Sequence, residues 1–119
     1  MEIANIVILS ISGLLLLTVG ALRLGNPIKN YQKNSGITLN NEVNLLNEVR
    51  GVSALMLLGG IIILLGTVIP KLTFTSSLVA ILIFIGFAIG RSLSIALDGK
   101  PNKQIIQGLM SELILGGAN

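Results

Sequence analysis

The sequence opens on an almost unbroken apolar run, IANIVILSISGLLLLTVGALRL, at residues 3–24. About 20 helical residues of this kind cross a hydrocarbon core of roughly 30 Å, because each residue adds about 1.5 Å. A cleaved signal peptide would begin with basic residues and carry a shorter apolar run, whereas this chain begins with Met1 and Glu2. We therefore predict a transmembrane helix at about 3–24.

Three further apolar stretches follow, and turn residues separate them. The dipeptide PK at 70–71 divides the second stretch from the third, and DGKP at 98–101 divides the third from the fourth. The fourth stretch has the shortest strictly apolar part. The prediction is an all-α membrane protein, a single domain at 1–119 that forms a four-transmembrane-helix bundle with both termini on the same side. The remaining predicted helices are at about 49–69, 72–97 and 102–117, after a polar loop at 25–47.

The loop at 25–47 carries turn signals at both ends of its first half, NP at 26–27 and SG at 35–36. Its second half has apolar residues at helical spacing. That spacing fits either a short helix lying on the membrane surface or a cap and lead-in turn for the next span. The apolar positions are Leu39, Val43 and Leu46.

The composition excludes a soluble globular domain, because 52% of the residues are hydrophobic and only 11% are charged, against about a quarter in soluble domains. The chain contains no cysteine and no histidine. It therefore lacks a thiolate nucleophile, a sulfur metal ligand and the usual proton-transfer residue, and we predict neither a metal nor a cofactor. The net charge of +3 is spread around the apolar stretches, so it indicates topology instead of nucleic-acid binding.

Basic residues are unevenly shared between the two sides of a four-span chain. Lys71 alone lies on the side of the termini. The other side carries Arg23, Lys29, Lys33, Arg50, Lys100 and Lys103. The positive-inside rule therefore predicts that the loop at 25–47 and the turn at 98–101 are cytoplasmic, with the N- and C-termini outside.

Two charged residues fall well inside the predicted spans, where an ion costs about 2.5–3.5 kcal/mol on insertion scales. At the helical rise, Arg91 lies roughly 10 Å inside the cytoplasmic end and Glu112 roughly 16 Å inside it. We expect the two side chains to pair across antiparallel helices. One interpretation is an ion pair that only sets helix register; the other is a polar pocket for an anionic head group, a small acid or a proton. The candidate binding layer comprises Glu48, Arg50, Arg91, Ser94, Asp98 and Glu112.

Gly86 and Gly90 form a GxxxG pattern on the third predicted helix. Small residues let transmembrane helices approach closely, so this pattern is typical of helix packing within a bundle and also of dimer seams. We expect one of these two contacts at Gly86 and Gly90.

Several motifs resemble those of a known family. They are NEVRG at 47–51, GRSLS at 90–94 and DGKP at 98–101, together with Glu112. With them the chain resembles a family of small bacterial four-helix membrane proteins whose family name is a domain of unknown function. The resemblance extends from the first span to the C-terminus, and R-x-x-S-x-x-x-D-G-x-P is its most specific part. It implies four helices in a bacterial cytoplasmic membrane and assigns no activity, substrate, cofactor or catalytic residue.

Three classes of function fit these observations. The first is a multi-pass membrane protein that binds or translocates an anionic amphiphile or small acid, since a planar guanidinium binds carboxylate or phosphate through two bonds. The second is a structural subunit that acts as a homo-oligomer or within a larger membrane complex. A lipid-modifying enzyme that uses Glu112 and Asp98 comes last, because the usual acid–base residue is missing. Membrane lipids are the expected partners, and nucleic acid is not.

Overall fold

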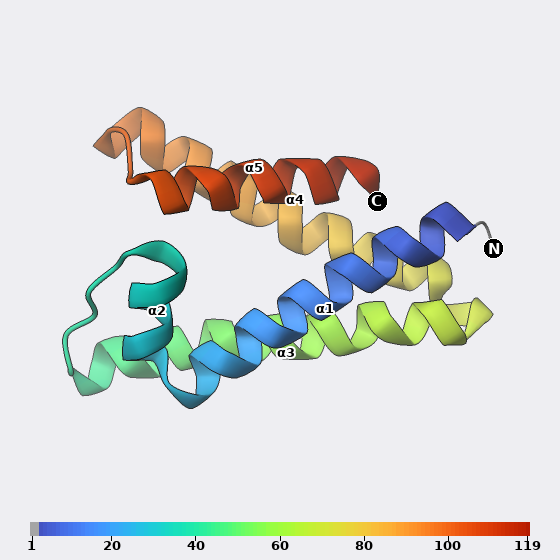
Figure 1. Ribbon diagram of the computed structural model, residues 1–119, viewed down its shortest axis with the longest axis horizontal. Coiled ribbons are helices and arrows are strands. Elements are labelled where there is room, and N and C mark those ends of the chain that lie inside the picture. Colours follow the sequence, from blue (N-terminus) through green and yellow to red (C-terminus); the bar gives the residue numbers. More distant parts are fainter. Residues whose placement is uncertain (1–2) are drawn as a thin grey trace.

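The computed structural model describes residues 3–119, and this part of the chain is all helical (Figure 1). A single 3-10 turn, η1 (Pro70–Leu72), joins the third helix to the fourth. The prediction of an all-helical chain is confirmed. The five helices are α1 (Ile3–Gly25), α2 (Pro27–Ser35), α3 (Val43–Val68), α4 (Thr73–Asp98) and α5 (Lys103–Ala118).

Three helical stretches are long and apolar enough to cross a membrane, namely Ile3–Gly25, Val43–Val68 and Pro70–Asp98. They suggest a membrane protein. Helix α5 has 16 residues, so its length is about 24 Å at the helical rise, which is less than a hydrocarbon core of roughly 30 Å. The predicted fourth helix is therefore present, but it is shorter than the three candidate spans.

The predicted loop at 25–47 is wrong in its first half, where the structure has helix α2. Asn26 caps this helix, since its Oδ1 accepts a bond of 3.3 Å from the Lys29 N–H, and Pro27 occupies the first helical position. Gly36 ends the helix in the left-handed region at φ 66°, which glycine adopts without strain. The turn signals at 26–27 and 35–36 thus bound a short helix.

In the second half of that loop, α3 begins at Val43, about two turns before the predicted start at 49. The asparagine-rich residues are therefore the lead-in turns of the span itself. No separate surface helix occurs between Ser35 and Val43.

Helix α1 packs more extensively on α3 than on any other helix, and glycines make this contact possible. A Cβ on Gly20 would come within 2.6 Å of the Leu57 backbone nitrogen, and one on Gly60 within 2.6 Å of the Leu17 backbone nitrogen. The two backbones therefore touch directly, which is the kind of contact that small residues allow between transmembrane helices.

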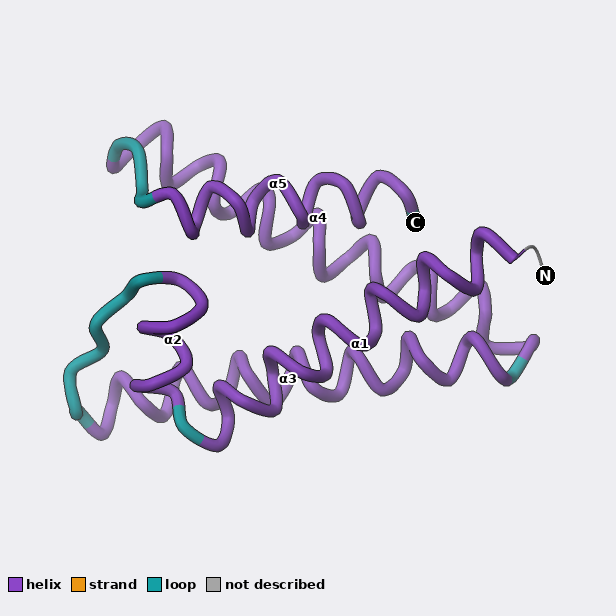
Figure 2. Tube along the Cα trace, in the orientation of Figure 1, coloured by secondary structure: helices purple, strands orange, loops and turns teal. Residues whose placement is uncertain are grey.

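Helix α4 packs on both α3 and α5. Near η1, Ser76 Oγ donates to the Ile62 carbonyl at 2.8 Å and Thr73 Oγ1 donates to the Gly66 carbonyl at 2.9 Å, which ties α4 to α3. The pairs α1/α3 and α4/α5 lie close together at the end that carries the termini and diverge toward α2 (Figure 2). The buried core lies along this junction and comprises Leu9, Leu16, Met56, Ile63, Ala80 and Phe84.

Candidate functional site

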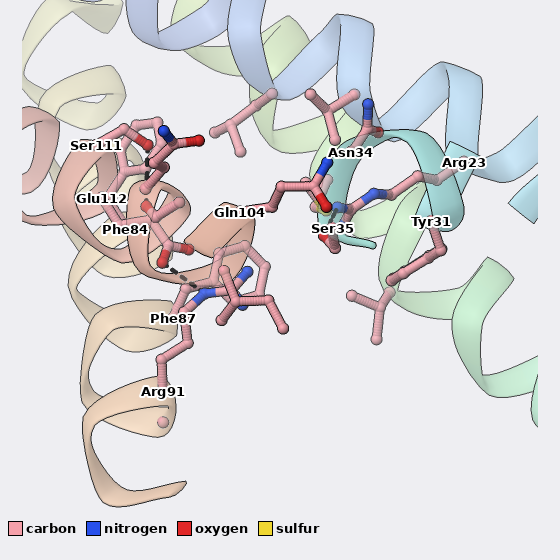
Figure 3. Close-up of a pocket in the computed structure, with 18 of the residues that line it drawn as sticks. Arg23, Tyr31, Asn34, Ser35, Phe84, Phe87, Arg91, Gln104, Ser111 and Glu112 are labelled. Carbon is pink, nitrogen blue, oxygen red and sulfur yellow. Dashed lines mark hydrogen bonds and ion pairs between the residues drawn. The ribbon is translucent and has the colours of Figure 1, made fainter. Parts of the chain in front are cut away.

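A cavity of about 730 Å³ lies where the two helix pairs diverge, and all five helices contribute to its walls (Figure 3). This volume falls within the range of roughly 300–1,000 Å³ that is usual for small-molecule sites. Much of the wall is apolar. The apolar side chains include Leu16, Val19, Met56, Phe84, Phe87 and Ile105.

On the α4/α5 wall, Arg91 and Glu112 form an ion pair in which Arg91 Nε donates to Glu112 Oε1 at 2.6 Å. The Glu112 side chain is 8% exposed and that of Arg91 is 30% exposed. The structure therefore brings together the two charges that the sequence predicts to pair. One carboxylate thus neutralises one guanidinium on this wall.

On the opposite wall, Arg23 of α1 is buried, with 8% of its surface exposed. Its Nη2 donates to Ser35 Oγ at 2.9 Å, and its guanidinium carbon lies 4.1 Å from the centroid of the Tyr31 ring. Arg23 Nε is buried without a hydrogen-bond partner, and no carboxylate within residues 3–119 forms a salt bridge with this side chain. A buried charge that lacks a counter-charge is costly, so this wall carries a cation that can bind an anion.

The charged side chains that line the cavity are Arg23, Arg91 and Glu112, so the lining has a formal charge of +1. Figure 3 shows Arg23 and Arg91 on opposite sides, with Gln104 of α5 reaching between them. A planar guanidinium suits carboxylate and phosphate oxygens. The cavity therefore combines an apolar wall with a positive polar end.

Helix α2 is held across this polar end by α5. Asn102 Nδ2 donates to the Ser35 carbonyl at 2.8 Å, and Gln104 Nε2 donates to the Lys33 carbonyl at 3.1 Å. Asn102 also caps α5, since its Oδ1 accepts from the Ile105 N–H at 2.9 Å. Because Ser35 binds both Arg23 and Asn102, it connects the buried cation to this contact between helices.

Arg50 and Glu48 were expected in the candidate binding layer, but the structure places both outside it. Arg50 Nη1 donates to the Leu24 carbonyl at 2.6 Å, so this exposed cation binds the C-terminal end of α1, where helix carbonyls lack partners. Glu48 is exposed on α3. Neither residue lines the cavity.

Ser94 and Asp98 of the candidate binding layer take different places relative to the cavity. Ser94 lines the rim of the cavity, and its Oγ donates to Asp98 Oδ2 at 3.1 Å. Asp98 is exposed at the end of α4 and lies outside the cavity lining. The structure therefore does not bring Asp98 and Glu112 together as an acid–base pair.

The expected internal packing at Gly86 and Gly90 is not found. A Cβ at either position would meet no atom of another helix within 4 Å, and both glycines line the cavity. The close helix contacts in the described chain lie elsewhere, notably at Gly13, Gly20 and Gly60. A dimer seam at Gly86 and Gly90 stays a prediction.

The place of Arg23 in the cavity does not follow from its use as a topology signal. The sequence does carry one indication of it, because the buried residues of α1 recur at helical spacing and Arg23 is the next position in that series. The buried positions of α1 are Leu9, Ser12, Gly13, Leu16, Gly20 and Arg23.

The family model described as a domain of unknown function (DUF4345) matches residues 5–119, and the chain belongs to this family. The predicted membership in an uncharacterised domain family is therefore confirmed. No curated protein and no solved structure matches the chain.

Proposed function

We propose that this chain is a multi-pass membrane protein that binds an anionic amphiphile with a single acyl chain, with the head group at Arg23 and the chain against the apolar wall. The observation that carries the proposal is the buried Arg23 side chain, which lines a cavity and has no carboxylate partner within residues 3–119. An anion bound in the cavity beside the Arg23 guanidinium would supply the missing counter-charge.

The apolar lining favours an amphiphile over a small hydrophilic acid. Phe84, Phe87 and Leu16 border the same cavity as Arg23. Each methylene group buried against such a wall contributes about 0.8 kcal/mol, whereas a small acid would gain only the ionic contact. A chain of several methylenes therefore supplies much of the binding free energy in this proposal.

The proposed topology has α5 as a fourth, shorter span and the α2 end in the cytoplasm of a bacterial cell, so that both termini are outside. Lys29, Lys33 and Lys100 are exposed at the α2 end, whereas Lys71 is exposed at η1. Excess positive charge on one side favours the cytoplasm for that side. The polar end of the cavity then lies near the cytoplasmic leaflet of the inner membrane, which allows an amphiphile to be bound or moved there.

The structural-subunit alternative has less support. The small size of the chain, its glycine-rich helix faces and its short outward loops favour it, but two of those glycines, Gly86 and Gly90, line the cavity. A lipid-modifying activity is also less well supported, because Asp98 lies outside the cavity that holds Glu112. Anion binding explains why the buried Arg23 has no carboxylate partner within residues 3–119, a feature that neither alternative requires.

Native mass spectrometry of the protein released from neutral detergent tests the proposal, with dodecanoate and acetate as probes. We expect one dodecanoate per chain and no retained acetate. Arg23→Gln should weaken dodecanoate binding about tenfold or more, since it removes a charge-assisted bond. Lys29→Gln, on an exposed cation of α2 that does not line the cavity, is the matched control and should bind normally.

Two results would overturn the proposal. One is dodecanoate binding that is equal in the wild type and in a folded Arg23→Gln protein. The other is binding that rises without saturation as dodecanoate is added, because that behaviour indicates detergent-like adsorption.

A further inference from the structure

The two guanidinium groups of the cavity differ in one respect. Arg91 Nε is bound by Glu112 at 2.6 Å, whereas Arg23 has no carboxylate partner among the described residues. Without Glu112 the lining would carry two free cations on facing walls, α1 on one side and α4 on the other. With Glu112 in place, one positive charge is left for a ligand.

We propose that Glu112 is a specificity-determining residue that restricts the cavity to head groups with a single negative charge, such as carboxylates, and disfavours phosphate monoesters. This inference rests on the proposed function. A phosphate monoester carries close to two negative charges above its second pKa of about 6. Its second charge would have no free cation to bind and would share the cavity with the Glu112 carboxylate.

Burial strengthens this discrimination. The Glu112 side chain is 8% exposed, so water screens its charge poorly. The bond to Arg91 Nε also sets the Glu112 carboxylate against the Arg91 guanidinium, so that its charge offsets that of Arg91. The cavity thus selects the head group through repulsion by Glu112 as much as through attraction by Arg23.

The test compares dodecanoate with dodecyl phosphate, which have the same chain and differ in head-group charge at about pH 8. Dissociation constants for both probes are measured in the wild type, in Glu112→Gln and in the double variant Arg91→Gln/Glu112→Gln. We expect the wild type to prefer dodecanoate by about tenfold. Glu112→Gln should shift this ratio about tenfold or more toward dodecyl phosphate, because the lining then carries two free cations.

The double variant is the charge-matched control. It restores a lining charge of +1 while it keeps the Glu112 substitution, so its ratio should return to the wild-type preference. A folded Glu112→Gln protein with an unchanged ratio would overturn the inference.

The wild-type measurement is decisive even if Glu112→Gln does not fold. A wild-type preference for dodecyl phosphate over dodecanoate contradicts the role of Glu112 and leaves the proposed function intact. Failure of both probes to bind the wild type contradicts the proposed function itself. The two failures are thus distinguishable.

Discussion

The guanidinium of Arg23 lies over the ring of Tyr31, 4.1 Å from its centroid, and its Nη2 binds Ser35 Oγ. These two contacts fix the plane of the guanidinium while Nε stays buried and unpartnered. The last turn of α1 and the helix α2 together hold a cation in place beside an apolar cavity. A fixed cation binds an anion with less loss of side-chain freedom than a mobile one.

Gly86→Leu should weaken ligand binding without unfolding the protein. Gly86 lines the cavity and has no atom of another helix within 4 Å of a Cβ, so a leucine there occupies ligand volume. Leucine is also favoured over glycine in a helix by up to about 1 kcal/mol. We expect about tenfold weaker dodecanoate binding with an unchanged or higher melting temperature.

The control for this change is Gly117→Leu on α5. Gly117 also has free space around a Cβ but does not line the cavity. Binding that is lost equally in both variants would show that a leucine on the bundle surface, and not cavity volume, causes the effect.

Gly20→Ala should destabilise the contact between α1 and α3. Its Cβ would lie 2.6 Å from the Leu57 nitrogen and 2.8 Å from the Ser53 carbonyl oxygen, and backbone atoms cannot move aside as a side chain can. Overpacking of this kind costs about 1–3 kcal/mol. Thermal unfolding in detergent measures the loss. Gly51→Ala, at an open position of α3, should be neutral or stabilising, and equal melting temperatures for both variants would contradict the direct backbone contact.

Asn102→Ala should loosen α2. The side chain caps α5 and also donates to the Ser35 carbonyl, so its removal costs about 1 kcal/mol at the cap and frees the C-terminal end of α2. Hydrogen exchange of the α2 amides should become faster. Asn44→Ala, at an exposed position of α3, serves as the control and should leave α2 exchange unchanged. Unchanged exchange in Asn102→Ala would mean that α2 is held by other contacts.

The positions of the helices can be read from the sequence better than the positions of the charges. The apolar runs predict α1 and α4 to within one residue at each end, because lipid-facing and buried residues are apolar alike. Helix α2 is polar, so apolar patterning does not reveal it. Only the cap signals at Asn26 and Gly36 mark its ends.

The cavity itself depends on which helix faces meet, and local patterns do not determine this. The pair Arg91 and Glu112 could be predicted, because a charge inside a span needs a partner. Arg50 at the end of a span can instead bind the free carbonyl of Leu24. Gly86 and Gly90 have the GxxxG spacing, yet α3 and α4 diverge there and leave the glycines beside open space.

Single-cysteine labelling in a bacterial inner membrane should test the proposed topology. The chain contains no cysteine, so each introduced thiol is unique. A membrane-impermeant maleimide should label Lys71→Cys in intact spheroplasts and should label Gln32→Cys, on α2, only after the membrane is opened. The reverse pattern would place the polar end of the cavity at the outer leaflet.

The most direct measurement of the central claim is photolabelling with a dodecanoate analogue that carries a diazirine on its chain, followed by peptide mass spectrometry. We predict adducts on Val19, Phe87 and Ile105, which line the cavity and are only partly buried, and their loss in Arg23→Gln. Adducts confined to Leu14, Leu55 and Leu82, which are 55%, 65% and 72% exposed on the outer surface, would contradict binding in the cavity.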